Sequence, residues 1–343
     1  MGILQLSKVI KKHASNAIVL RPMEYFNGKT IAIDASMSIY QFLIAIRSDG
    51  VMLSGGETTS HLVGMFYRTI RLVEKGIKIL YVFDGKPPEI KIQEIEKRNI
   101  RRAEAEEKYK EAEKDGDKEL MAKFDKRKVK VGKIHVDECK KLLTLMGIPF
   151  VTAPSEAEAF CAYLAHKNIV YGVGTEDMDA LTFGAPRLLR NLNAAESKKL
   201  PVEEYNLDKI LSQLDMKMEE FIDMCIILGC DYTQSLKGVG PQKAVTFIRK
   251  YKKIEEILKH EKYTAVENWE YKNARLIFNT LGKEDAPLPN LDIRWNEINL
   301  QNINEYLVKE KQFDEERVKK GIERLFKGKK KAKQGSLDDF FRK

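Results

Sequence analysis

The chain has 343 residues, 43% of them hydrophobic and 32% charged, and this is long enough to bury a large core in one or two domains. Its formal net charge of +9 favours a polyanionic partner such as nucleic acid. The sequence has no run of 18 apolar residues, so we expect no membrane-spanning helix. Its five histidines and four cysteines lack the paired spacing of a zinc site, so any metal would need carboxylate ligands.

Four short segments rich in β-branched or aromatic residues predict buried strands, at 29–34, 77–84, 147–151 and 169–177. Segments of helical periodicity alternate with them, at 36–47, 58–75, 135–146 and 156–167. This alternation predicts an α/β fold, with a mostly parallel central sheet and helices on both faces.

The segment APSEAEAF places Ser155 three residues before Glu158, ahead of an apolar run. This spacing is typical of a helix capping box, with Ser155 as the N-cap and Glu158 at the third helical position. A capping box would explain both residues without any chemistry. A role for Glu156 and Glu158 beyond starting a helix therefore depends on the other acids of the chain.

Residues 91–130 interrupt the alternation directly after the strand that ends at Asp84. Of these 40 residues 25 are charged, 14 basic and 11 acidic, so a helix formed here has little apolar surface to bury. Most of these charges fit a solvated helical insertion with i,i+4 ion pairs. Lys91 and Arg98, seven residues apart on one helix face, are candidates to neutralise a transferring phosphate, and Arg101 and Arg102 are candidate DNA contacts.

The pattern from 203 to 280 is helical and contains the turn GVGPQKA at 238–244. Gly-x-Gly-Pro is typical of a helix-hairpin-helix, whose backbone N–H groups bind a nucleic-acid phosphate without reading sequence. Its candidate DNA contacts are Lys237, Gly238, Gly240 and Lys243. A glycine-rich turn that only joins two helices is the alternative. After 321 the chain is basic, and we expect a disordered tail.

Acidic residues follow every predicted strand, and a further one follows an apolar helix: Asp34, Asp84, Glu156, Glu158, Asp177, Asp179 and Asp231. Because the carboxyl ends of parallel strands meet at one edge of a sheet, we expect these acids to gather there. One such acid fits a turn or a helix cap, but acids after four strands are hard to explain by capping. Oxygen ligands select Mg²⁺, with Mn²⁺ as a substitute, and seven carboxylates suit a two-ion site for phosphodiester hydrolysis.

Four further residues are weaker candidates for DNA binding. Tyr40 could stack on an exposed base, although an aromatic residue in a helix beside a sheet is more often part of the core. Arg47, Arg68 and Arg71 are candidate phosphate contacts.

The chain resembles the flap endonucleases of the eukaryotic type, structure-specific 5′-nucleases related to the xeroderma pigmentosum group G nuclease. The motifs that carry the resemblance run along nearly the whole chain: IAIDASMSIYQFL, YVFDGKPP, PSEAEA, TEDMDALTFG, and LGCDY followed by GVGPQKA. The resemblance implies a PIN-like 5′-nuclease fold, with an H2TH-like helix-hairpin-helix that could hold a monovalent cation.

The resemblance also implies roles for the residues named above. The seven carboxylates would bind two metal ions, and Lys91 and Arg98 would be the catalytic basic pair. The charged insertion would be a helical arch through which a 5′ single strand passes, Tyr40 would stack near the scissile nucleotide, and Gly2 would lie near the active site. The implied enzyme is a Mg²⁺-dependent 5′ flap endonuclease with 5′–3′ exonuclease activity, acting on branched DNA in lagging-strand maturation and long-patch base excision repair.

The segment QGSLDDFF resembles a sliding-clamp motif for proliferating cell nuclear antigen, with anchors Gln334, Leu337, Phe340 and Phe341. Exposed aromatics at a mobile end are otherwise hard to explain. Eukaryotic relatives carry a longer basic tail beyond this motif, whereas here the basic run 327–333 precedes it. We expect that run to serve nuclear import and DNA binding, and a nuclear location, with the nucleolus and mitochondrion as further compartments.

The expected organisation is one nuclease domain at 1–320, acting as a monomer. Its parts are an N-terminal region at 1–105, the arch at 85–134, an internal region at 122–252 with the helix-hairpin-helix at 235–251, and a tail at 321–343 with the clamp motif at 334–341. Three alternatives remain. They are an exonuclease or a junction or bubble nuclease on the same fold, a catalytically silent DNA- or clamp-binding scaffold, and a small-molecule phosphatase.

Overall fold

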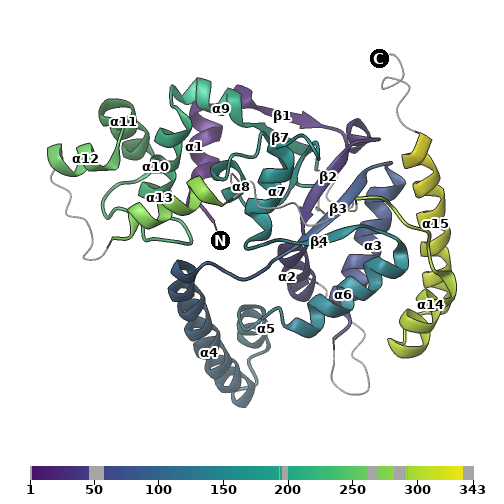
Figure 1. The fold of residues 1–343 in the computed structure, drawn as a ribbon. Helices are drawn as coiled ribbons and strands as arrows, with labels where there is room; N and C mark the ends of the chain where they lie inside the picture. The colour runs from purple at the N-terminus through teal and green to yellow at the C-terminus, as the bar shows by residue number, and fades with distance from the viewer. Residues whose placement is uncertain are drawn as a thin grey trace.

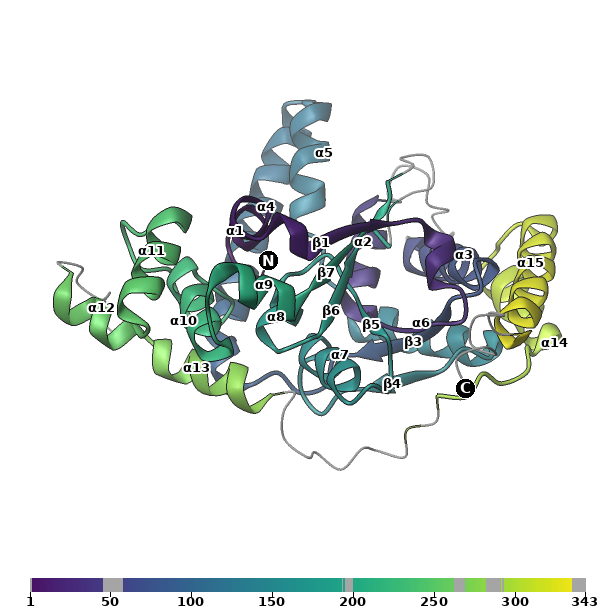
Figure 2. The same ribbon diagram turned by 90° about the horizontal axis from the view of Figure 1, so that it is seen from above.

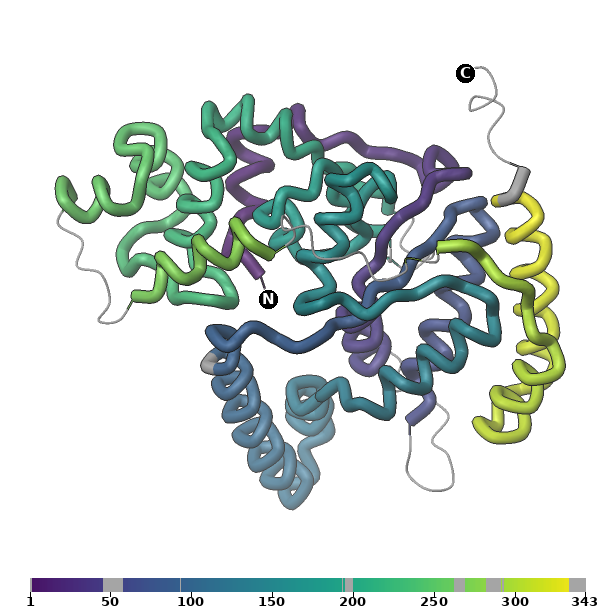
Figure 3. The backbone as a smooth tube through the Cα atoms, in the orientation of Figure 1, coloured from purple at the N-terminus to yellow at the C-terminus, as the bar shows by residue number. Residues whose placement is uncertain are grey.

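The computed structural model describes residues 2–45, 58–192, 194, 200–261, 269–281, 291 and 293–334, and the rest is grey in Figure 3. Of the predicted site residues, Arg47, Leu337, Phe340 and Phe341 lie outside this part of the chain. Gln334 is described only as the last residue of a helix.

A single seven-stranded sheet forms the centre of the molecule, in the order β1-β7-β6-β5-β2-β3-β4 (Figure 1). The strands are β1 Ile18–Arg21, β2 Thr30–Asp34, β3 Lys78–Phe83, β4 Phe150–Thr152, β5 Gly172–Gly174, β6 Arg187–Arg190 and β7 Val202–Asn206. The five strands from β6 to β4 run parallel, whereas β7 and β1 pair antiparallel at one edge. The predicted mostly parallel α/β sheet is confirmed.

Helices cover both faces of this sheet, as the view in Figure 2 shows. On one face the apolar core takes in α1 Leu6–His13, α7 Ala157–His166, α8 Asp179–Thr182 and α9 Leu207–Leu214, with the 3-10 turn η1 Ser15–Ala17. On the other face it takes in α2 Ala35–Ala45, α3 Ser60–Glu74, α6 Lys133–Met146 and α15 Glu315–Gln334, with the turn η2 Met23–Phe26, α14 Leu300–Asn304 and the π-helical turn η5 Glu305–Glu310. Central strands buried on both faces read as continuous apolar runs, which is why TIAID and KILYVF were recognisable.

The charged insertion forms a helical hairpin that projects from the body beyond the carboxyl end of β3 (Figures 1 and 2). It consists of the turn η3 Glu89–Lys91, α4 Ile92–Lys114 and α5 Lys118–Arg127. Asp117 caps α5 by accepting from the backbone N–H groups of Glu119 and Leu120, each at 3.0 Å. Few of its side chains are buried, as the charge of the segment predicts.

A second group of helices forms a lobe at the end of the molecule away from α14 and α15 (Figure 1): α10 Met218–Leu228, α11 Pro241–Tyr251, α12 Ile254–His260 and α13 Tyr271–Thr280. The buried carboxylate of Asp223 joins three of these helices, because it accepts from Arg275 on α13 and from the N–H of Ile254 on α12. None of the helices in the described part of the chain is long and apolar enough to cross a membrane.

Two sequence expectations are wrong. The predicted capping box does not form, because Ser155 donates its hydroxyl hydrogen bond to the carbonyl of Lys86 at 3.0 Å and the N-cap of α7 is Glu156. The first N–H of α7, that of Ala157, is instead bound by Asp84 at 2.9 Å. Asp84, which follows another strand, therefore binds the start of α7 in place of Ser155.

The tail expected to be disordered from 321 is helical as far as Gln334, as part of α15. This helix packs against α3, and its glycines allow a close approach: a Cβ on Gly328 would meet the backbone of Val73 at 2.7 Å. Within the basic run 327–333, Lys329 is buried, and its ammonium donates to the carbonyls of Met146, Gly147 and Asn296 at 3.0, 3.0 and 2.7 Å. The basic run is thus partly a structural anchor that satisfies the C-terminal carbonyls of α6.

Replacing this buried lysine should weaken the attachment of α15. We expect Lys329→Met to lower the free energy of unfolding by about 2–4 kcal/mol, because it removes the buried ammonium to which three carbonyls are bound. Urea unfolding measures the effect. The exposed neighbour provides the control, since Lys330→Met should change the free energy by less than about 0.5 kcal/mol. Equal stability of the two variants would contradict the anchor.

Candidate metal centre and its cationic arch

The predicted carboxylates meet beyond the carboxyl ends of β2, β3, β4 and β5. Six of them line one cavity of about 390 Å³: Asp34, Asp84, Glu156, Glu158, Asp177 and Asp231. The seventh, Asp179, is buried in the first turn of α8, and its oxygen lies within 4.8 Å of those of Glu158 and Asp177. The structure therefore brings together the set that the sequence proposed, whereas its role as a metal-ligand set remains a prediction.

The first residues of the chain pack into this cluster. The N–H of Ile3 donates to Asp179 at 2.6 Å, and the N–H of Gly2 points to Asp231 at 3.4 Å. Gly2 has φ +78°, and a Cβ there would meet Asp177 Oδ1 at 1.7 Å. Glycine is therefore required at this position by both the backbone conformation and the space.

Burial and mutual repulsion keep protons on several of these acids. Burial, with the neighbouring charge of Asp84, raises the pKa of Asp34 to about 8. Burial and nearby carboxylates likewise raise the pKa values of Glu158, Asp177 and Asp179 above their usual range. Such a cluster stays ionised only when cations lie close to it.

Two cations from the arch approach the cluster at the end toward the helical lobe. Lys91 Nζ lies 2.5 Å from Glu156 Oε1 and 3.9 Å from Asp231, while Arg98 donates to Asp231 at 2.6 Å. Although burial opposes it, these two cations hold the pKa of Asp231 below its ordinary value. Burial would lower the pKa of Lys91, but the carboxylates of Glu156 and Asp231 raise it above its ordinary value.

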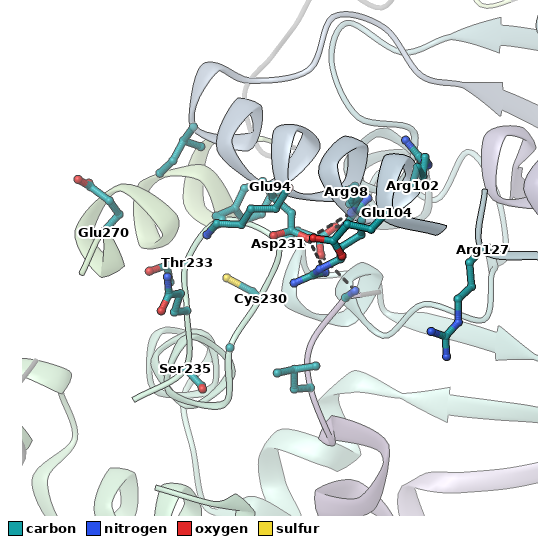
Figure 4. A pocket seen from close by; sticks show the side chains of 18 of the residues that line it. Glu94, Arg98, Arg102, Glu104, Arg127, Cys230, Asp231, Thr233, Ser235 and Glu270 are labelled. Atoms are coloured by element: carbon teal, nitrogen blue, oxygen red, sulfur yellow. Dashed lines mark hydrogen bonds and ion pairs between the residues drawn. The ribbon is translucent and has the colours of Figure 1, made fainter. Parts of the chain in front are cut away.

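A larger hollow of about 840 Å³ opens between the arch and the lobe (Figure 4). Arg98, Arg102 and Glu94 reach into it from α4, and Asp231, Thr233 and Ser235 from the segment after α10. Arg101, which is 70% exposed, and Tyr40 also line this hollow. We call the cavity of the carboxylates the acidic cavity, and the larger hollow between the arch and the lobe the basic opening. Tyr40 and Arg102 border both, so they connect the two.

Other candidate DNA contacts lie farther from this centre. Arg71 donates to the carbonyls of Leu192 and Ala194, and Arg68 donates to Gln41 and covers the ring of Phe42 at 4.0 Å. Burial lowers the pKa of Arg68 to about 10. Both arginines thus have partners within the protein, and their role as phosphate contacts stays a prediction.

The predicted helix-hairpin-helix contacts lie together in the turn between α10 and α11. Lys237, Gly238 and Gly240 are exposed there, and Lys243 donates to the carbonyl of Gly238 at 3.3 Å. Gly238 has φ +80°, a conformation that favours glycine. Pro241 stands at the first position of α11, where its missing N–H would have had no partner within the helix, and phosphate binding at this turn stays a prediction.

Sequence reasoning missed two residues at the acidic cavity. Lys130, in the segment after α5, lines it together with the cations Lys91, Arg98 and Arg102. Tyr232 donates its hydroxyl hydrogen bond to Glu156 Oε2. Its position directly after Asp231 in LGCDY was the available signal, but an apolar run ending in an aromatic residue predicts only core packing.

Comparison with known proteins agrees with this geometry. The XPG N-terminal domain matches residues 1–105, and the XPG I-region matches residues 147–231. Flap endonuclease 1 of Encephalitozoon cuniculi is 56% identical over 341 residues, covering 99% of both chains. The Homo sapiens flap endonuclease 1 is 50% identical over 347 residues, covering 100% of this chain and 91% of that protein. The chain belongs to the XPG family of nucleases.

Within that family it is a structure-specific flap nuclease, and the two matched regions contribute the strands that end at the acidic cavity. Among solved structures, the flap endonuclease-1 from Methanococcus jannaschii superposes with a TM-score of 0.70 at 30% identity, covering 91% of this chain and 96% of that chain. The catalytic core of Rad2 in complex with DNA substrate has a TM-score of 0.67 at 26% identity, covering 94% of this chain and 100% of that chain.

The raised pKa of Asp34 predicts how stability depends on pH without metal. Between its ordinary value of 3.8 and the folded value of about 8, the folded protein holds a proton that the unfolded chain has released. The bound proton therefore contributes to the free energy of unfolding. This contribution is complete below pH 4 and is lost as the pH rises toward 8.

In EDTA at pH 8 we expect Asp34→Asn to raise the free energy of unfolding by about 1–3 kcal/mol, and this gain should shrink toward pH 5. Urea unfolding at both pH values measures it, with the exposed Glu323→Gln as control. A gain that does not depend on pH would contradict the repulsion.

Proposed function

We propose that this nuclease is a Mg²⁺-dependent 5′ flap endonuclease that hydrolyses DNA phosphodiesters at branched junctions. The observation that supports this most strongly is the acidic cavity at the sheet edge, because a basic helical arch borders it directly. A small-molecule phosphatase would need neither the arch nor the hairpin turn. A silent scaffold would have no use for buried carboxylates that repel one another.

The residues at the sheet edge fit divalent cations. Asp177 Oδ1 is buried and has no hydrogen-bond partner among the described residues, and Glu158 and Asp179 place oxygens beside it. An all-oxygen donor set suits Mg²⁺ or Mn²⁺. We propose two ions, held by Asp34, Asp84, Glu156, Glu158, Asp177, Asp179 and Asp231. When bound, they would supply the charge stabilisation that phosphodiester hydrolysis requires.

The cations and Tyr40 would arrange the substrate at this site. Lys91 and Arg98 lie where a phosphate entering the cavity from the arch would meet them, so they would neutralise its developing charge. Tyr40 borders both cavities and would stack on the base next to the scissile bond. Arg101 and Arg102 would guide the single strand through the basic opening.

The duplex beside the flap would be held by backbone contacts away from the cavity. Exposed Lys237 and the N-terminus of α11 offer positive charge and N–H groups to a phosphate, with a monovalent cation as a further element of the turn. Holding duplex and single strand at separate places would make cleavage depend on the shape of the DNA. The same site would remove nucleotides from a 5′ end, as a 5′–3′ exonuclease.

An enzyme that cleaves branched DNA would act in lagging-strand maturation and long-patch base excision repair, and it would be located in the nucleus. A sliding clamp would recruit it through the motif at 334–341, whose first residue ends α15. With part of the basic run 327–333 docked on the body, its exposed lysines would serve nuclear import.

A substrate panel tests the proposed activity. With Mg²⁺ we expect a 5′-flap duplex to be cleaved faster than a gapped duplex, a bubble or a linear end. Asp179→Ala should lower the rate at least about 100-fold, since it removes a carboxylate beside those of Glu158 and Asp177. A different preferred substrate, or a normal rate in the variant, would refute the proposal. Cleavage of linear ends above all others would favour the exonuclease alternative.

The clamp motif has its own test. Phe340→Ala combined with Phe341→Ala should abolish stimulation by proliferating cell nuclear antigen and leave cleavage without the clamp unchanged, because the motif supplies only recruitment. Flap cleavage with and without the clamp measures both effects. Loss of clamp-free cleavage would show that the tail belongs to the catalytic body.

A further inference from the structure

Glu156 is held from two sides. Its Oε1 lies 2.5 Å from the ammonium of Lys91, at the base of the arch. Its Oε2 accepts the hydroxyl hydrogen bond of Tyr232, from the segment that follows α10. Glu156 is only 6% exposed, so these two groups replace the water that would otherwise solvate its carboxylate.

The ring of Tyr232 is fixed by its surroundings. It is buried, and it packs edge-on against Phe183 and Phe278, with ring centroids 6.5 and 5.2 Å away. Phe278 belongs to α13, so the phenol is seated in the helical lobe. Because the ring is packed on two sides, its hydroxyl is directed at Glu156. The hydrogen bond leaves the Glu156 carboxylate little freedom to rotate.

We propose that Tyr232 is a positioning residue for the cleavage reaction. Its hydroxyl sets the orientation of the Glu156 carboxylate and, through Glu156, the place of the Lys91 ammonium. The inference rests on the proposed function, in which Glu156 is a metal ligand and Lys91 neutralises the phosphate. Hydrogen bonds of this kind to metal ligands typically matter about 10–100-fold for metal affinity or rate.

The same contact connects three parts of the molecule. Glu156 is the N-cap of α7 at the sheet edge, Lys91 ends η3 at the base of the arch, and Tyr232 packs against α13. A buried tyrosine with a merely structural role would also need a partner for its hydroxyl. A positioning role differs from a structural one in what the loss of the hydroxyl should change.

Tyr232→Phe removes that single oxygen and keeps the packed ring. We expect the single-turnover rate on a saturating 5′-flap duplex to fall about 10–100-fold, and the affinity for Mg²⁺, measured by calorimetry without DNA, to fall about 10-fold. The affinity for the flap duplex in Ca²⁺ should stay close to wild type, because the phosphate contacts are unchanged. The thermal unfolding midpoint should fall no more than in Tyr205→Phe, because each variant loses one phenol hydrogen bond to a carboxylate. Tyr205→Phe is the matched control, since its buried phenol donates to Glu203 on β7, away from the cavity.

A double-mutant cycle decides whether the effect passes through Glu156. In a Glu156→Gln background, Tyr232→Phe should cause little further loss of rate or Mg²⁺ affinity. Wild-type rate and Mg²⁺ affinity in Tyr232→Phe would overturn the inference, and so would equal losses in both backgrounds or a loss confined to DNA affinity or unfolding. Failure of the wild type to cleave flaps would instead refute the proposed function, and the Mg²⁺ titration would still decide the role of Tyr232.

Discussion

The repulsion among buried carboxylates at the sheet edge is the constraint around which the rest of the structure is built. Burial and proximity raise the pKa values of four of these acids, so the cluster costs folding free energy in the absence of cations. The fold offsets this cost with groups from distant parts of the chain. They include the N–H of Ile3, the N–H of Ala157 and the side chains of Lys91 and Arg98.

Both appendages of the sheet are joined at this edge. The arch reaches the cluster through Lys91, and the helical lobe reaches it through Tyr232, with Glu156 between them. A nuclease that selects DNA by shape must place single strand and duplex accurately relative to one reaction centre. Under the proposed function, a carboxylate held from both sides would give the arch and the lobe a common point of reference.

Sequence reasoning succeeded where a residue's role depends on its place along a strand. The acids after the predicted strands could be assigned to one edge because parallel strands end together. It failed where partners are distant. Ser155 and Glu158 have the spacing of a capping box, yet Asp84, which follows another strand, binds the helix start. β1, β6 and β7 each include charged residues, so they do not stand out as apolar runs. The tail after 321 looked solvated because its few apolar side chains and Lys329 find their partners in distant segments, among them α3, α6 and Asn296.

The sequence by itself determined the α/β class, the gathering of acids at one sheet edge and the charged arch, because these follow from local periodicity and from the order of strands and acids. Only the tertiary structure decided which group binds which carboxylate oxygen. Gly2 packing against Asp177, Tyr232 directed at Glu156 and Lys329 under the end of α6 are contacts between residues far apart in the chain. No local sequence pattern encodes such pairs. They form because close packing of the elements excludes water from polar groups, which must then be hydrogen-bonded by other groups of the protein.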